Sequence, residues 1–153
     1  MTSSVAPFRL DEGVLLEDSG TMLPWSAGVN ELLDLAGGYQ TRWEEVTWSN
    51  QHVLGGLRAN VRFILRRLAF EIMPAFDNPE DEEKAYRTCF EHLCNKMGAP
   101  HESRKDKSEI VAGLIYPVSI WSFEDIELRL RTSEGDSSGL IPFCDLSITR
   151  KKG

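Results

Sequence analysis

Cysteine and histidine have the widest chemistry among the side chains of this chain, and four of them lie close together. Cys89, His92 and Cys94 fall within six residues, and His101 follows them. On a helix, Cys89 and His92 are three positions apart and could share a metal ion. Cys94 points elsewhere, so this segment does not supply a closed tetrahedral set of ligands. We therefore interpret both cysteines as small core residues and expect no metal site.

A catalytic thiol is the second chemistry that these residue types permit. The candidate pairs join Cys89 or Cys144 to His52, His92 or His101. Such a pair requires spatial contact, which a sequence does not show. Cys144 alternates with Leu146 and Ile148, and this pattern predicts a buried, inert thiol. The chain contains no GxGxxG, GxxxxGK[ST], GxSxG or HExxH motif, and we predict neither enzymatic activity nor a cofactor.

Acidic side chains gather at two places, which we predict to contact a partner. They are Glu80, Asp81, Glu82 and Glu83 at the start of an expected helix, and Glu124, Asp125 and Glu127 beside a late strand. Acidic groups at a helix start interact favourably with the helix dipole, by about 0.3–1 kcal/mol per charge, and this explains the first cluster without a partner. The alternative is a docking patch for a basic protein, since opposite charge speeds association. Residues 132–139 form an expected loop that is the next candidate contact.

Composition limits the partner and the compartment. The 153 residues include 17 basic and 24 acidic side chains, which gives a net charge of −7, and 41% of the residues are apolar. A net negative charge disfavours nucleic acid as a partner, and no apolar run approaches the roughly 20 residues of a membrane span. Three cysteines cannot all pair, and the first residues lack the signal-peptide pattern, so we expect a cytoplasmic protein. We expect flexible residues 1–7 and then one domain at 8–150.

The elements that would position these side chains are mostly clear from periodicity. We expect a hairpin over 8–23 with its turn at Asp18–Gly20, a short helix capped by Ser26, and an extended stretch from Trp43 to Leu54. A long helix follows Pro79 and ends at Gly98, a polar loop covers 100–109, and antiparallel strands form the last third. Among the four tryptophans, we expect Trp25 to be the most exposed.

Residues 57–73 permit two interpretations. With a period of two and a turn at Arg66-Arg67, they form two strands with three apolar cross-strand pairs: Leu65 with Leu68, Phe63 with Phe70, and Val61 with Ile72. With a period of 3.6, they form one helix with an apolar stripe. Phe63 and Phe70 lie off the helical stripe, and we favour the strands. The fold class that follows is α+β, an antiparallel sheet packed by two main helices, with a duplicated helix-plus-three-strand unit as an open alternative.

The stretches LPWSAGVNELLDLAGG, HVLGGLRANVRF and SIWSFEDIELRLR give the chain a layout similar to that of a known class. It resembles the small acidic α+β immunity proteins of bacterial polymorphic-toxin and type VI secretion systems. Its repeated helix-plus-sheet pattern is also similar to that of β-lactamase-inhibitory proteins, which grip an enzyme with a concave sheet.

The resemblance implies tight one-to-one inhibition of a cognate toxin by a monomer or homodimer that performs no catalysis. Two alternatives stay open: an adaptor or chaperone for a secreted effector, and a small ligand-binding or enzymatic domain.

Overall fold

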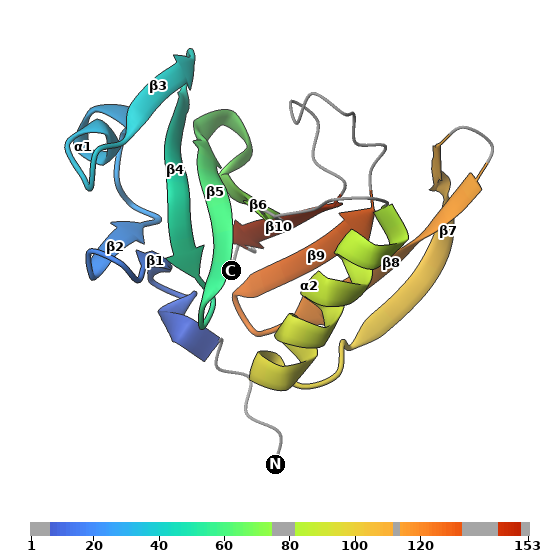
Figure 1. The fold of residues 1–153 in the computed structure, drawn as a ribbon. Coiled ribbons are helices and arrows are strands. Elements are labelled where there is room, and N and C mark those ends of the chain that lie inside the picture. The colour runs from blue at the N-terminus through green and yellow to red at the C-terminus, as the bar shows by residue number, and fades with distance from the viewer. Residues whose placement is uncertain (1–6, 75–81, 112–113, 133–143, 151–153) are drawn as a thin grey trace.

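A computed structural model describes residues 7–74, 82–111, 114–132 and 144–150 (Figure 1). The helical segments are the short 3-10 turns η1 (Pro7–Arg9) and η2 (Leu65–Arg67) and the α-helices α1 (Val29–Leu33) and α2 (Glu82–Met97). The strands are β1 (Gly13–Leu16), β2 (Thr21–Pro24), β3 (Tyr39–Arg42), β4 (Glu45–Val53), β5 (Leu57–Ile64), β6 (Ala69–Pro74), β7 (Glu102–Val111), β8 (Leu114–Ser122), β9 (Ile126–Thr132) and β10 (Cys144–Arg150).

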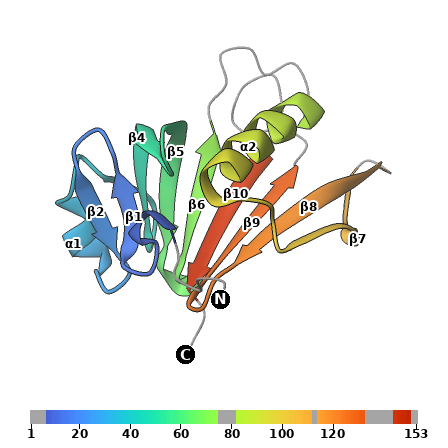
Figure 2. The same cartoon turned by 90° about the horizontal axis from the view of Figure 1, so that it is seen from below.

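Eight of these strands form one antiparallel sheet in the order β3-β4-β5-β6-β10-β9-β8-β7. It consists of two four-stranded meanders, one from β3 to β6 and one from β7 to β10, which meet where β6 pairs with β10. β1 and β2 form a separate hairpin, as predicted from the turn at Asp18–Gly20. Figure 2 shows this hairpin and α1 beside the β4–β5 part of the sheet, and α2 beside the other part.

The prediction of two main helices is wrong, and so is that of a helix-plus-three-strand unit. α2 has 16 residues, whereas α1 has five, and four strands follow each of them. α1 is short because its N-cap is Gly28, which offers no side-chain acceptor, and not Ser26 as predicted. At its other end, Ala36 and Gly37 have φ of 50° and 76°, which stops the helix. The molecule is therefore a broad sheet with one long helix.

The strand interpretation of residues 57–73 is confirmed in its register. Val61 opposes Ile72 and Phe63 opposes Phe70 on β5 and β6, as the period of two predicts. The third predicted pair does not form in the ladder, since Leu65 begins η2 and Leu68 follows it in the turn.

The prediction of a polar loop at 100–109 is wrong, because residues 102–111 are strand β7. This strand lies at one edge of the sheet and pairs only with β8, with Glu102 opposite Ile120. A polar edge strand has no apolar alternation to reveal it, and polar edges discourage pairing with other chains.

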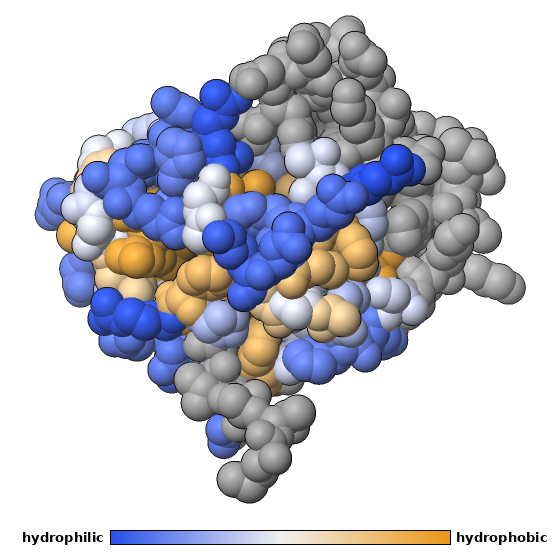
Figure 3. All heavy atoms as spheres, turned by 60° about the horizontal axis from the view of Figure 1, so that its bottom comes forward, coloured by the Kyte–Doolittle hydropathy of each residue, from blue (hydrophilic) through white to orange (hydrophobic). Residues whose placement is uncertain are grey.

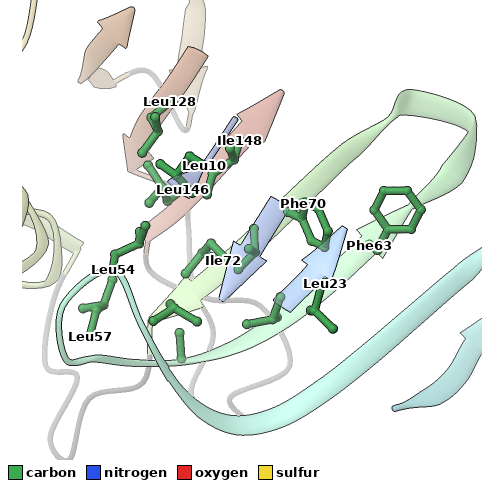
Figure 4. Packing of buried hydrophobic residues seen from close by; sticks show 14 of the residues in the cluster. Leu10, Leu23, Leu54, Leu57, Phe63, Phe70, Ile72, Leu128, Leu146 and Ile148 are labelled. Atoms are coloured by element: carbon green, nitrogen blue, oxygen red, sulfur yellow. The ribbon is translucent and has the colours of Figure 1, made fainter. Parts of the chain in front are cut away.

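One face of the sheet is apolar and covered. Phe70, Ile72, Leu146 and Ile148 lie fully buried on the two central strands, and Figure 4 shows them with Leu23 from the hairpin. Trp25 packs against Phe70 with ring centroids 4.9 Å apart. Its indole Nε1 donates to the carbonyl of Leu10 at 2.7 Å, and only 5% of the residue is exposed. The prediction that Trp25 is the most exposed tryptophan is therefore wrong.

The long helix covers the same face farther along the sheet. Phe90 of α2 contacts Trp121 of β8, with ring centroids 6.2 Å apart, and the Tyr86 hydroxyl bonds that of Ser119. Ser119 and Trp121 oppose Leu130 and Leu128 in the register, so they point to the covered face. On the side drawn in Figure 3, apolar residues gather in the middle of the surface with hydrophilic ones around them.

The opposite face, which we call the open face, is polar over its central strands, whereas Thr47 and Ile120 nearer its two edges are buried. A single row of cross-strand partners runs over all eight strands: Tyr39, Thr47, Arg62, Glu71, Ser147, Arg129, Ile120 and Glu102. The register places the helix-facing side chains on the other side, so none of the described helices covers this face. Its central strands therefore offer charged side chains to solvent or to a partner.

Candidate functional site

The three histidines occupy separate structural positions. His52 Nδ1 lies 3.0 Å from the Asp18 carboxylate, His92 Nε2 lies 2.9 Å from the Leu54 carbonyl, and His101 Nδ1 accepts a bond from the Ser122 amide at 2.7 Å. Each contact joins two elements of the fold. None of the three histidines forms a hydrogen bond with Cys89 or Cys94. Neither of the two cavities whose lining residues are described contains a histidine.

The two cysteines of α2 are unlike reactive thiols. Cys89 is fully buried, and burial raises the pKa of the Cys94 thiol above its ordinary value. A raised pKa lowers the thiolate population, which is the reverse of what a nucleophile or a metal ligand needs. Within the part of the chain that the structure describes, no group of three His, Cys, Asp or Glu side chains is placed to hold a metal ion.

The seven predicted acidic contacts are spread over the molecule. Glu80 and Asp81 lie outside the described residues, Glu82 and Glu83 begin α2, and Glu124, Asp125 and Glu127 lie at the β8–β9 turn and on β9. The loop at 132–139 lies outside the described residues after Thr132. The β8–β9 turn is near the far end of α2, since Trp121 Nε1 donates to the Gly98 carbonyl at 3.0 Å. Glu82 and Glu83 are thus separated from the β8–β9 turn by about the length of α2, roughly 22 Å, and do not form one patch with it.

A different feature stands out at one end of the sheet, where two turns meet. Trp43, in the turn between β3 and β4, is 80% exposed, while Trp48 five residues later is 1% exposed. The carbonyl of Glu44 accepts a hydrogen bond from the Leu65 amide at 3.0 Å, which joins this turn to η2. We call the surface formed by Arg42, Trp43, Glu44, Arg66, Arg67 and Leu68 the turn patch.

Leu68 gives the turn patch a second exposed apolar side chain. It is 42% exposed and has φ of 48°, a left-handed conformation in which a branched side chain is strained. Glu44 in the neighbouring turn is also left-handed, with φ of 63°. Glycine or asparagine would relieve this strain, by about 1 kcal/mol per position. Burial in the core does not account for either left-handed conformation, because neither side chain is buried there.

A polar groove on the open face continues from the turn patch. It has a volume of about 230 Å³ and crosses β6, β10 and β9. Its lining residues are Arg67, Ala69, Glu71, Glu127, Arg129, Arg131, Ser147 and Thr149. We call it the arginine groove. Arg67 and Ala69 flank Leu68 in the chain, so the patch and the groove form one continuous surface.

Ion pairs fix one wall of the arginine groove. Glu71 lies between two guanidinium groups, 3.5 Å from Arg62 and 3.9 Å from Arg67. Arg62 also lies 3.7 Å from the carboxylate of Glu45, whose side chain is only 6% exposed. On the other wall, the side chains of Glu127 and Arg129 form no hydrogen bond or ion pair with any described residue. The groove therefore combines a neutralised wall with a wall on which Glu127 and Arg129 have no partner among the described residues, whereas Arg131 does have one.

Sequence reasoning missed the turn patch and most of the groove. Trp43 was assigned to the start of an extended stretch, and no strand was expected at Tyr39–Arg42. The signal that could have located the turn is the run Arg42-Trp43-Glu44-Glu45, where a large aromatic stands between charged residues. Of the predicted contacts, only Glu127 lines the groove.

Comparison with known proteins adds no relative: no family model, no curated protein and no solved structure matches this chain. Over the described residues, none of the helices has both the length and the apolar character required to span a membrane. The geometry of the turn patch and the arginine groove is therefore the basis for a functional proposal.

Proposed function

We propose that this chain is an immunity-type binding protein, which inhibits a cognate toxin or effector by tight association and without catalysis. The observation that carries the proposal is Trp43, 80% exposed on a turn that a backbone bond ties to η2 and its exposed neighbour Leu68. A few residues supply most of the binding energy in protein interfaces; tryptophan and arginine are enriched among them, and the turn patch contains both.

The scaffold beneath the turn patch suits a rigid interface. β4 and β5 continue from the patch into buried strand residues, among them Val46 and Phe63. A surface whose backbone is already ordered loses little conformational entropy on binding. An interface of ordinary size covers roughly 800 Å² on each partner, enough to include the patch and the adjacent groove.

Catalysis has less support than binding. The histidines are held in contacts that join elements of the fold, and the Cys94 thiol is shifted toward its protonated form. The proposal includes a cytoplasmic location, which the free thiols of Cys89 and Cys94 support. We propose a monomer or a modest homodimer that needs no cofactor.

The test uses the protein encoded by the gene next to this chain, since immunity and toxin genes are normally adjacent. Expression of that neighbour should arrest growth, and co-expression of this chain should restore it. Trp43→Ser should abolish the rescue and lower the affinity of the purified pair by about 30-fold or more. Glu91→Gln is the control, because its side chain is exposed on α2 and lies outside both the turn patch and the predicted acidic clusters.

Two outcomes would overturn the proposal. One is a neighbour that binds but keeps its full activity, which would identify an adaptor or chaperone instead. The other is a neighbour whose toxicity this chain does not relieve. An undiminished rescue by Trp43→Ser with Leu68→Ser would leave the function standing and remove the turn patch from the interface. A strong loss with Glu124→Gln alone would favour the acidic cluster that the sequence predicted.

A further inference from the structure

We infer that the arginine groove receives carboxylate side chains from an acidic segment of the protein partner. This inference rests on the proposed function, because it names the chemistry by which the same partner would extend beyond the turn patch. It starts from the charges that line the groove: Arg131 has a partner of its own and Arg67 lies beside Glu71, whereas Arg129 has no partner among the described residues. The guanidinium of Arg129 is therefore the positive charge in the groove that an acidic group could pair with.

Arg129 is the centre of the argument. It lies on β9, an inner strand of the second meander, where it is half-buried and directly opposite Ser147 of β10. Its guanidinium forms no ion pair or hydrogen bond with any described residue. A guanidinium presents up to five donors in a planar fork, which matches the two oxygens of a carboxylate.

The surroundings of Arg129 suit an acidic side chain better than an apolar one. The hydroxyls of Ser147 and Thr149 line the groove beside it and can donate to a carboxylate oxygen. Arg67 lies on the opposite wall, where a Glu71 oxygen at 3.9 Å satisfies it only weakly. The groove thus has donors from two walls directed at one volume of about 230 Å³.

A segment of a protein is favoured over a free anion because the groove is open at the turn patch. Arg67 and Ala69, which line the groove, adjoin Leu68, which is exposed in the patch. An apolar residue of the partner against Trp43 and Leu68, followed by an acidic residue, would therefore fill both surfaces at once. Glu127 adds a carboxylate at the far wall, which would repel a second acidic group and orient the segment.

The first experiment follows the ¹⁵N signals of the labelled protein, including the arginine Nε–H groups, by nuclear magnetic resonance. An acetylated hexaglutamate peptide should shift the signals of Arg129, Arg67 and Ser147 in a saturable way, and hexalysine at equal ionic strength should not. Arg129→Gln should lower the affinity for the hexaglutamate peptide by about ten-fold, the effect of losing one charged hydrogen-bonding partner. Arg58 is a half-buried arginine of the open face outside the groove, and Arg58→Gln should change the peptide affinity by less than about two-fold.

Several results would overturn the inference. They are shifts that hexalysine reproduces, shifts that Arg129→Gln leaves unchanged while the variant stays folded, and equal saturation by free glutamate or inorganic phosphate. The last result would identify a general anion site and not a site for a protein segment. Arg129→Lys keeps the charge without the fork, so it should recover only part of the peptide affinity.

A second experiment separates this inference from the proposed function. Against the neighbouring gene's product, Trp43→Ser and Arg129→Gln should each weaken binding. If only Trp43→Ser does so, the groove inference fails and the proposed function stands. If neither variant weakens the complex, the groove inference fails. The proposed function fails only if the bound neighbour keeps its full activity, whatever the peptide does.

Discussion

The two faces of the eight-stranded sheet differ in what places their side chains. On the covered face, Phe63, Phe70 and Ile148 are buried without exception, and their positions follow from simple alternation in the sequence. On the open face, Glu71 and Arg129 come near each other only because the register aligns β6, β10 and β9, which are far apart in the chain. Stability is therefore concentrated on the covered face, while the open face can vary its charges to suit a partner.

The largest effect should separate two neighbours in the chain, Phe70 and Glu71. Phe70→Ala should lower the free energy of unfolding by about 3–5 kcal/mol, because it removes a fully buried ring that contacts Phe63 and Trp25. Glu71→Ala on the open face should cost about 1 kcal/mol, because its partners Arg62 and Arg67 remain solvated in part. Urea unfolding measures both. Equal losses would mean that the two faces contribute alike.

The next effect concerns the contact that fastens the hairpin to the covered side. The Glu17 carboxylate accepts bonds from the amides of Gly55 at 2.7 Å and Gly56 at 2.8 Å. Glu17→Ala should destabilise the protein by about 2–3 kcal/mol, since two charge-assisted bonds are lost. Hydrogen exchange of both glycine amides should accelerate as well.

Glu91→Ala provides the control for Glu17→Ala. Its side chain is exposed on α2, and its removal should change the unfolding free energy by less than about 0.5 kcal/mol. If the glycine amides exchange at the same rate in Glu17→Ala as in the unmodified protein, the fastening role of Glu17 would be wrong.

Much of the covered face could be predicted from the sequence, and the pairing of Phe63 with Phe70 is the clearest case. Alternation identifies a strand when one of its faces is buried, because burial demands apolar residues at every second position. At 57–73 the pattern of apolar residues fits a helix as well as two strands. Phe63 and Phe70 favour the strands, because they lie off the helical stripe. The helix ending at Gly98 was confirmed by the Gly98 φ of 84°.

The open face and the turn patch could not be predicted in the same way. The edge strand β7 has polar residues where no core requires apolar ones, and β3 has only four residues. The exposure of Trp43 depends on the left-handed turn at Glu44, a conformation that glutamate does not signal. The neighbours of Arg129 depend on the pairing of β10 with both β6 and β9, which joins distant segments. The roles of the seven acidic residues stay a prediction.

A smaller effect should distinguish Trp43 from the three buried tryptophans. Trp25, Trp48 and Trp121 are each at most 5% exposed, so iodide should quench the fluorescence of Trp43 alone. Trp43→Phe should remove the quenched component and change the unfolding free energy by less than about 0.5 kcal/mol. Binding of the neighbouring gene's product should protect Trp43 from iodide. Unprotected fluorescence in a confirmed complex would show that the turn patch stays solvent-exposed.

The smallest effect compares two left-handed residues at different places. Leu68 and Ala36 have φ of 48° and 50°, and Leu68→Gly and Ala36→Gly should each raise the unfolding free energy by a few tenths of a kcal/mol, since relief of backbone strain slightly exceeds the entropy of glycine in the unfolded chain. Only Leu68→Gly should lower the affinity for the partner, by about five-fold, because Leu68 lies in the turn patch and Ala36 does not. A variant that gains stability while it loses affinity shows that the Leu68 side chain is kept for binding although its backbone is strained. If both variants bind equally well, the strain at Leu68 has no role in the interface.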